Sequence, residues 1–242
     1  MKSVVNIIQT MKNILVTSAL AIITFVACSD DVQEYDPYFD WQVRNEAWYR
    51  SVADSARMAI AKAKQMYGED WDKAENCQWR MFKTLYQAQD YDTGRLTDSI
   101  CVRIASRGTG DYSPTWSDSV RISYRGWMMP TTYKLYNADN VLVDSTMQEV
   151  FSQSYYGEFT PKTAAPVLSA ITPFVEGFNT ALQYMVEGDD WFVYIPCQLA
   201  YGETAKNAIP AYSTLLFRIH LAAIYPAGSG VPTWKTPMLK NE

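Results

Sequence analysis

The stretch that most constrains the fold covers residues 174–221, where a helical pattern, a turn and two strand patterns follow one another. Apolar residues recur every three or four positions over 174–185, which predicts a short helix with one apolar face. Residues 187–189 break this pattern, because their central glycine tolerates the backbone of a turn. Alternating residues then predict strands over 191–195 and 215–221. A helix held against such a sheet encloses an apolar concavity.

Specific motifs occupy these elements. They read VEGF at 175–178, TALQYM at 180–185, LAYG at 199–202 and STLLF at 213–217. In order, spacing and residue type they resemble the signature of the FKBP-type peptidyl-prolyl cis-trans isomerases. The resemblance extends more weakly upstream to Ile100, and so covers roughly half of the chain. It implies an α+β fold, in which a curved antiparallel sheet wraps around a short helix.

The N-terminal residues predict export and lipidation. An apolar run over 14–26 follows Lys2 and Lys12, and is too short to span a bilayer but typical of a signal peptide. It ends in Ala27-Cys28-Ser29, which resembles the bacterial lipobox, whose cysteine becomes a lipidated N-terminus. The following acidic residues resemble the export tract of lipoproteins in Bacteroidetes. We therefore expect an outer membrane lipoprotein on the periplasmic or cell-surface side, with an ordinary secretory signal as the alternative.

The next region carries a helical pattern. Apolar residues at steps of three and four from Trp48 to Met66 predict a helix that begins near Trp41 and ends at Gly68. The period of residues 71–91 is ambiguous between helix and strand. This mainly helical appendage either packs on the following domain or spaces it from the membrane, or it serves as a dimerisation helix or substrate-cradling arm.

The remaining pattern is that of a β-rich domain. Alternation predicts strands over 100–104 and 120–124, and a hairpin across 135–143. A short strand at 166–168 leads to the helix described above. The irregular residues 147–165 form either a cover over one side of the pocket or a plain surface insertion. The predicted organisation is a signal peptide (1–27), an acidic tether (28–40), an N-terminal helical region (41–98), an isomerase domain (99–225) and a C-terminal tail (226–242).

The resemblance also implies the site. Phe178 forms the floor of the pocket, where the family most often has tryptophan, and the other catalytic positions are Tyr124, Asp144 and Tyr201. The Tyr201 hydroxyl would hold a carbonyl, and Asp144 would orient tyrosine hydroxyls. The implied substrate-binding residues are Val143 (where the family usually has phenylalanine), Val167 on the outer rim, Val175, Ile209 through its inward-pointing backbone N–H, and Phe217.

The implied activity is rotation of X–Pro amide bonds in extracytoplasmic polypeptides, without a covalent step or a cofactor. The alternative is an FKBP-like module that binds polypeptide, with weak or no catalysis. The only histidine, His220, lies on the outward face of its strand, which argues against triad chemistry and a histidine-rich metal site. The net charge of −5 argues against a nucleic-acid partner. Three further cysteines form either one disulfide or none: Cys77, Cys101 and Cys197.

Overall fold

The computed structural model describes residues 36–73, 75–85, 95–139, 141–161 and 164–235. The described residues from Pro37 onward form one compact unit. The predicted signal peptide, the lipidation site Cys28 and most of the acidic tether lie outside the described residues. Among the described helices, none has both the length and the apolar character needed to cross a bilayer.

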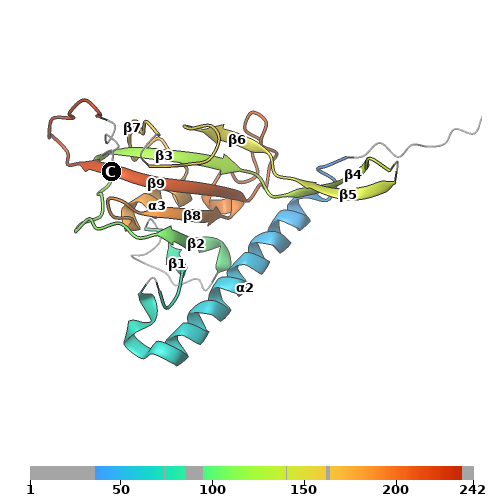
Figure 1. Cartoon of the computed structure of the whole chain (residues 1–242), viewed down its shortest axis with the longest axis horizontal. Coiled ribbons are helices and arrows are strands. Elements are labelled where there is room, and N and C mark those ends of the chain that lie inside the picture. The colour runs from blue at the N-terminus through green and yellow to red at the C-terminus, as the bar shows by residue number, and fades with distance from the viewer. Residues whose placement is uncertain (1–35, 74, 86–94, 140, 162–163, 236–242) are drawn as a thin grey trace, which may run out of the picture. The chain divides into compact units, whose positions relative to one another are not determined.

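A seven-stranded antiparallel sheet forms the centre of this unit (Figure 1). Its strands lie in the order β1-β2-β8-β9-β3-β6, with β7 also paired to β3. Their bounds are β1 (Trp79–Lys83), β2 (Ser99–Ser106), β3 (Ser119–Trp127), β6 (Val150–Gln153), β7 (Val167–Ala170), β8 (Asp190–Ile195) and β9 (Leu215–Tyr225). With the short helix α3 (Glu176–Tyr184) against it, the sheet gives the α+β architecture that the sequence predicted.

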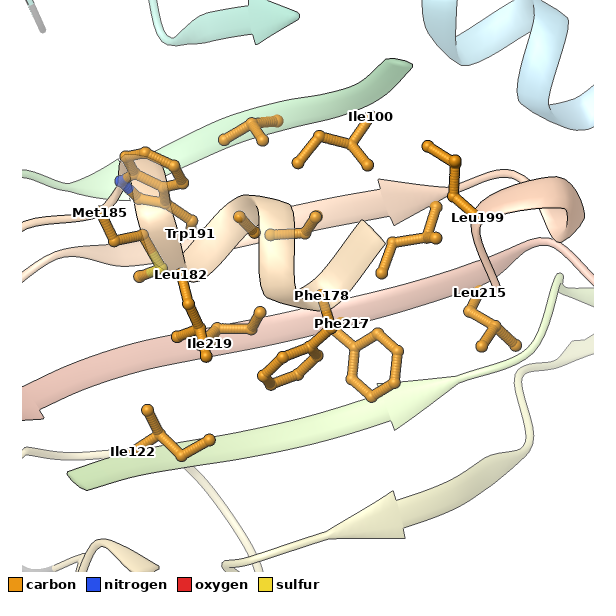
Figure 2. Close-up of a cluster of buried hydrophobic side chains, with 14 of the residues drawn as sticks. Ile100, Ile122, Phe178, Leu182, Met185, Trp191, Leu199, Leu215, Phe217 and Ile219 are labelled. Carbon is orange, nitrogen blue, oxygen red and sulfur yellow. The ribbon is translucent and has the colours of Figure 1, made fainter. Parts of the chain in front are cut away.

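The core lies between α3 and this sheet. Phe178 and Leu182 on the apolar face of α3 are at most 1% exposed, and they face alternate residues of β8 and β9 such as Trp191 and Ile219 (Figure 2). Helix and sheet approach closely at Gly177, where a Cβ would lie 2.3 Å from the Ile195 side chain. The absence of a side chain at position 177 therefore sets how deeply the first turn of α3 can pack.

Two strands stand apart from the main sheet. β4 (Thr131–Tyr136) and β5 (Leu142–Met147) pair only with each other among the described strands. Figure 1 shows their hairpin extending away from the end of β3. The side chain of Asn137 accepts hydrogen bonds from the backbone N–H groups of Asp139 and Val141 at 3.0 and 2.9 Å, which closes the turn. The predicted hairpin is confirmed.

The long helix α2 (Trp41–Tyr67) is docked on the sheet. Gly68, with φ 55°, ends it as the sequence predicted. The indole N–H of Trp41 donates to the Ser213 hydroxyl at 2.8 Å, and the Asn45 side-chain oxygen accepts the backbone N–H of Thr214 at 2.8 Å. Both contacts hold the helix to the residues that open β9. Of the two alternatives for this region, the structure therefore favours packing on the following domain.

Residues 71–91, whose period was ambiguous between helix and strand, contain both kinds of element in their described part. These are the short 3-10 helix η2 (Gly68–Asp72) and the edge strand β1, which pairs with β2. A second 3-10 helix, η3 (Leu96–Asp98), precedes β2. The three cysteines of the described part are buried free thiols: Cys77, Cys101 and Cys197.

Candidate functional site

A cavity of about 510 Å³ opens where α3, β3, β6 and β9 meet the loop that follows β8. That loop contains the 3-10 helix η4 (Cys197–Leu199). The lining residues are Tyr124, Phe151, Ser152, Pro173, Phe174, Val175, Phe178, Tyr201, Lys206, Asn207, Ala208, Ile209 and Phe217. This volume lies in the range of sites that bind small ligands or a few residues of a peptide.

Aromatic rings build the walls of the cavity. Phe178 is 1% exposed and meets Phe217 edge to face, with ring centroids 5.0 Å apart. The Tyr124 ring also meets the Phe178 ring edge to face, with centroids 5.9 Å apart and planes at 84°. Phe174 stacks on the Phe178 ring, with centroids 4.4 Å apart. Phe174 lies just before α3 and Phe178 in its first turn, while strand alternation points Tyr124 and Phe217 inward.

Gly126 makes room for two of these rings. A Cβ at this position would lie 2.6 Å from Phe217 and 2.7 Å from Phe151. These rings meet edge to face at 5.3 Å. A glycine on β3 is thus required by the close approach of the cavity wall.

Polar side chains also reach the cavity: those of Tyr124, Ser152, Tyr201, Lys206 and Asn207. The Tyr124 hydroxyl lies 3.3 Å from the Ser152 hydroxyl. Burial, with the nearby Tyr124, raises the pKa of Tyr201, so this hydroxyl stays protonated at neutral pH and can donate a hydrogen bond. Lys206 carries the only charged side chain among the described lining residues.

Residues 110–222 match the family described as FKBP-type peptidyl-prolyl cis-trans isomerase. This segment is an FKBP-type domain. The match contains every residue of the cavity lining.

Curated relatives share this domain. The macrophage infectivity potentiator of Trypanosoma cruzi is 30% identical over 152 residues, which cover 62% of this chain and 65% of the relative. Outer membrane protein MIP of Legionella longbeachae is 29% identical over 133 residues, which cover 54% of this chain and 47% of the relative. The crystal structure of FkpA from Escherichia coli has a TM-score of 0.42 at 20% identity and covers 89% of this chain and 83% of its own. The chain thus spans from about half to just under two thirds of the length of these two curated relatives.

The FKBP-type domain brings six of the nine predicted site residues to one cavity: Tyr124, Val175, Phe178, Tyr201, Ile209 and Phe217. It places Asp144, Val143 and Val167 elsewhere. Val167 lies on β7, 40% exposed and paired with Ile122. Asp144 and Val143 lie on β5, where Asp144 is exposed and paired in register with Lys134.

The placement predicted for Asp144 and Val143 is therefore wrong. Their strand pairs within its own hairpin, so it is not the strand that continues the main sheet along β3. β6 takes that position, within the segment that the sequence left irregular, and brings Phe151 and Ser152 to the cavity. The turn that begins at Asn137 predicts that these two strands pair with each other, but no signal in the sequence predicts that the hairpin stands apart from the main sheet.

The role predicted for the backbone of Ile209 also needs correction. Its N–H donates to the Lys206 carbonyl oxygen at 2.9 Å, and the Lys206 N–H donates back to Ile209 at 2.9 Å. Asn207, with φ 53°, forms the tight turn between them. The Ile209 side chain lines the cavity, but its N–H is already paired within the loop.

Proposed function

We propose that the protein is a peptidyl-prolyl cis-trans isomerase that acts on proline-containing polypeptides outside the cytoplasm. The observation that carries this proposal is the aromatic cavity over Phe178, which lies within the segment that matches the FKBP-type family. The activity is a proposal for this chain, because the chain spans only part of the length of its curated relatives.

The reaction needs no bond to form or break. Rotation about an X–Pro amide meets a barrier of about 18–20 kcal/mol, because the C–N bond has partial double-bond character. A catalyst has only to bind the twisted amide better than the planar one. In the twisted amide, nitrogen and carbonyl are decoupled and the group is less polar, so a water-poor aromatic cavity favours it.

Different lining residues would bind the proline ring and the carbonyl of the twisted amide. The rings of Phe178 and Phe217 would hold the pyrrolidine ring on a floor that is almost fully buried. The Tyr201 hydroxyl would donate to the carbonyl of the turning amide. The Tyr124 and Ser152 hydroxyls, 3.3 Å apart, would complete a polar edge without a carboxylate among the described lining residues.

A proline-limited refolding assay with the purified protein tests the proposal. We expect the slow phase of a substrate protein to accelerate in proportion to the amount of protein added, and Tyr201→Phe and Phe178→Leu each to reduce that effect. Catalysis that survives both changes together would exclude this cavity as the site.

A polypeptide-binding module without catalysis is the second candidate. Two observations favour it: the cavity has no carboxylate among its described lining residues, and the Ile209 N–H is paired within its own loop. Binding of an unfolded polypeptide with no acceleration of its refolding would select this function over the isomerase.

We further propose that a lipid on Cys28 attaches the protein to the outer membrane. The apolar run that ends in Ala27-Cys28 supports this, and one relative bears the printed name outer membrane protein. Radiolabelled palmitate should label the protein in cells that export it, and Cys28→Ser should abolish the label. Equal labelling of both forms would contradict the assignment of Cys28.

A further inference from the structure

We propose that Lys206 gives the cavity a preference for polypeptides with an acidic residue immediately before the proline. This inference rests on the proposed isomerase function and names the substrate class of the same site. It follows from the charges around the cavity, from the geometry of the loop and from the position of Tyr201.

The charge around the cavity has one sign. Lys206 is the only charged side chain among the described lining residues. These residues include no carboxylate, because Asp144 lies on the β4–β5 hairpin and Ser152 lines the cavity. No carboxylate lies within ion-pair distance of the Lys206 ammonium in the described part of the chain. Glu203, the acidic residue of the same loop, is exposed, and the ion pairs of the described residues include none between it and Lys206. With no ion-pair partner among the described residues, the ammonium is available to an incoming anion.

The loop holds Lys206 in a defined place. Its backbone is fixed by the paired hydrogen bonds with Ile209 at 2.9 Å. The far end of the loop is fixed as well, because the Tyr212 N–H donates to the Gly202 carbonyl oxygen at 2.8 Å. Lys206 and Tyr201 therefore line the same cavity from one loop, and the backbone of that loop is held by hydrogen bonds of its own.

The register of the substrate follows from Tyr201. The carbonyl of the turning amide belongs to the residue before proline, so a hydroxyl that holds this carbonyl brings that residue to the 201–209 loop. A carboxylate on its side chain would then reach the Lys206 ammonium. Exposed ion pairs of this kind change a free energy modestly, which corresponds to about a two- to fivefold difference in kcat/KM between glutamate and glutamine substrates.

The test uses tetrapeptides of the form Ala-Xaa-Pro-Phe, with Xaa as Glu, Gln, Lys or Leu, and the whole protein. We expect kcat/KM to follow the order Glu above Gln above Lys at low salt, with the difference between Glu and Gln shrinking in 0.5 M salt because screening shortens the range of the interaction (about 10 Å at 0.1 M and 3 Å at 1 M). Lys206→Gln should equalise Glu and Gln, and Lys206→Glu should place Lys first. Lys206→Arg should keep the original order.

Lys62→Gln is the matched control, since Lys62 is exposed on α2 and lines a different cavity. It removes the same charge and should leave the order unchanged. Equal rates for Glu and Gln in the native protein, or a preference that Lys206→Gln does not alter, would overturn the inference. A preference seen only in Ala-Ala-Pro-Glu, with the acid after the proline, would overturn it as well. Absence of catalysis with every peptide would instead overturn the proposed isomerase function.

Discussion

The ring of Phe178 meets the ring of Phe217 edge to face, with 5.0 Å between centroids and 86° between planes (Figure 2). One residue comes from the helix and the other from the central strand β9, so the contact serves both the core and the cavity floor. Substitutions at this contact should therefore affect both the stability of the domain and the isomerase activity proposed for it.

Phe178→Leu should keep the fold and lower kcat/KM for proline isomerisation, because it removes the flat floor while filling most of the volume. Phe178→Ala should in addition destabilise the protein by about 3–5 kcal/mol. Peptide isomerisation and urea unfolding measure the two effects. Leu182→Ala is the control, since Leu182 is fully buried on the same helix but does not line the cavity. It should cost about 2–5 kcal/mol with unchanged kcat/KM per folded molecule.

Ser152, which lines the cavity, should matter for catalysis, whereas Asp144, which the sequence analysis placed in the site, should not. Ser152→Ala removes the partner of the Tyr124 hydroxyl and should lower kcat/KM roughly two- to tenfold, the range of one hydrogen bond. Asp144→Ala should leave kcat/KM unchanged, because this side chain is exposed on the β4–β5 hairpin. A large loss in Asp144→Ala would show that the hairpin contributes to catalysis.

Gly126→Ala should deform the cavity wall. Its Cβ would press on Phe217 and Phe151 at 2.6 and 2.7 Å, so we expect a loss of about 1–3 kcal/mol in stability and a higher KM. Gly230→Ala provides the comparison, because no heavy atom lies within 4 Å of its Cβ position. An unchanged KM in Gly126→Ala would show that the two rings can move aside freely.

Asn45→Ala should destabilise the whole unit, not the helix alone. Its amide accepts the Thr214 N–H at 2.8 Å and donates to the Trp41 carbonyl oxygen at 2.8 Å, both in buried surroundings. Leaving the Thr214 N–H unpaired should cost about 1–3 kcal/mol. Urea unfolding followed by fluorescence and circular dichroism should show one shared transition. The exposed Ser55→Ala should change the free energy of unfolding by less than about 0.5 kcal/mol.

His220 should make the stability depend on pH. Burial lowers the pKa of His220 in the folded protein, with Asp190 opposing this shift, whereas the unfolded chain has a pKa of about 6.5. Below that value the unfolded state binds the proton first, so the free energy of unfolding should fall as the pH drops from about 6.5 towards the folded pKa.

His220→Gln should remove this component of the pH dependence. Urea unfolding between pH 5 and 7.5 measures it, and since the chain has one histidine, NMR titration reports the folded pKa of His220 without overlap. A folded pKa at or above 6.5 would contradict the expected direction.

Periodic patterns within single segments were enough to predict much of the fold. The amphipathic spacing that predicted α3, the alternation that predicted β8 and β9, and the breaker at Gly68 that ended α2 are all properties of short stretches. Family motifs in the same stretches located Phe178, Tyr201 and Phe217 at one cavity.

Pairing between distant segments decided the rest. β6, not β5, pairs with β3 and continues the main sheet. For this reason Ser152 lines the cavity and Asp144 does not. The Asn45 amide likewise has a partner, Thr214, that lies far away in the sequence and that no local pattern specifies. Periodicity predicts which face of a helix or strand is apolar. Strand neighbours and long-range hydrogen-bond partners depend on segments far apart in the sequence, so they are determined only when the whole chain has folded.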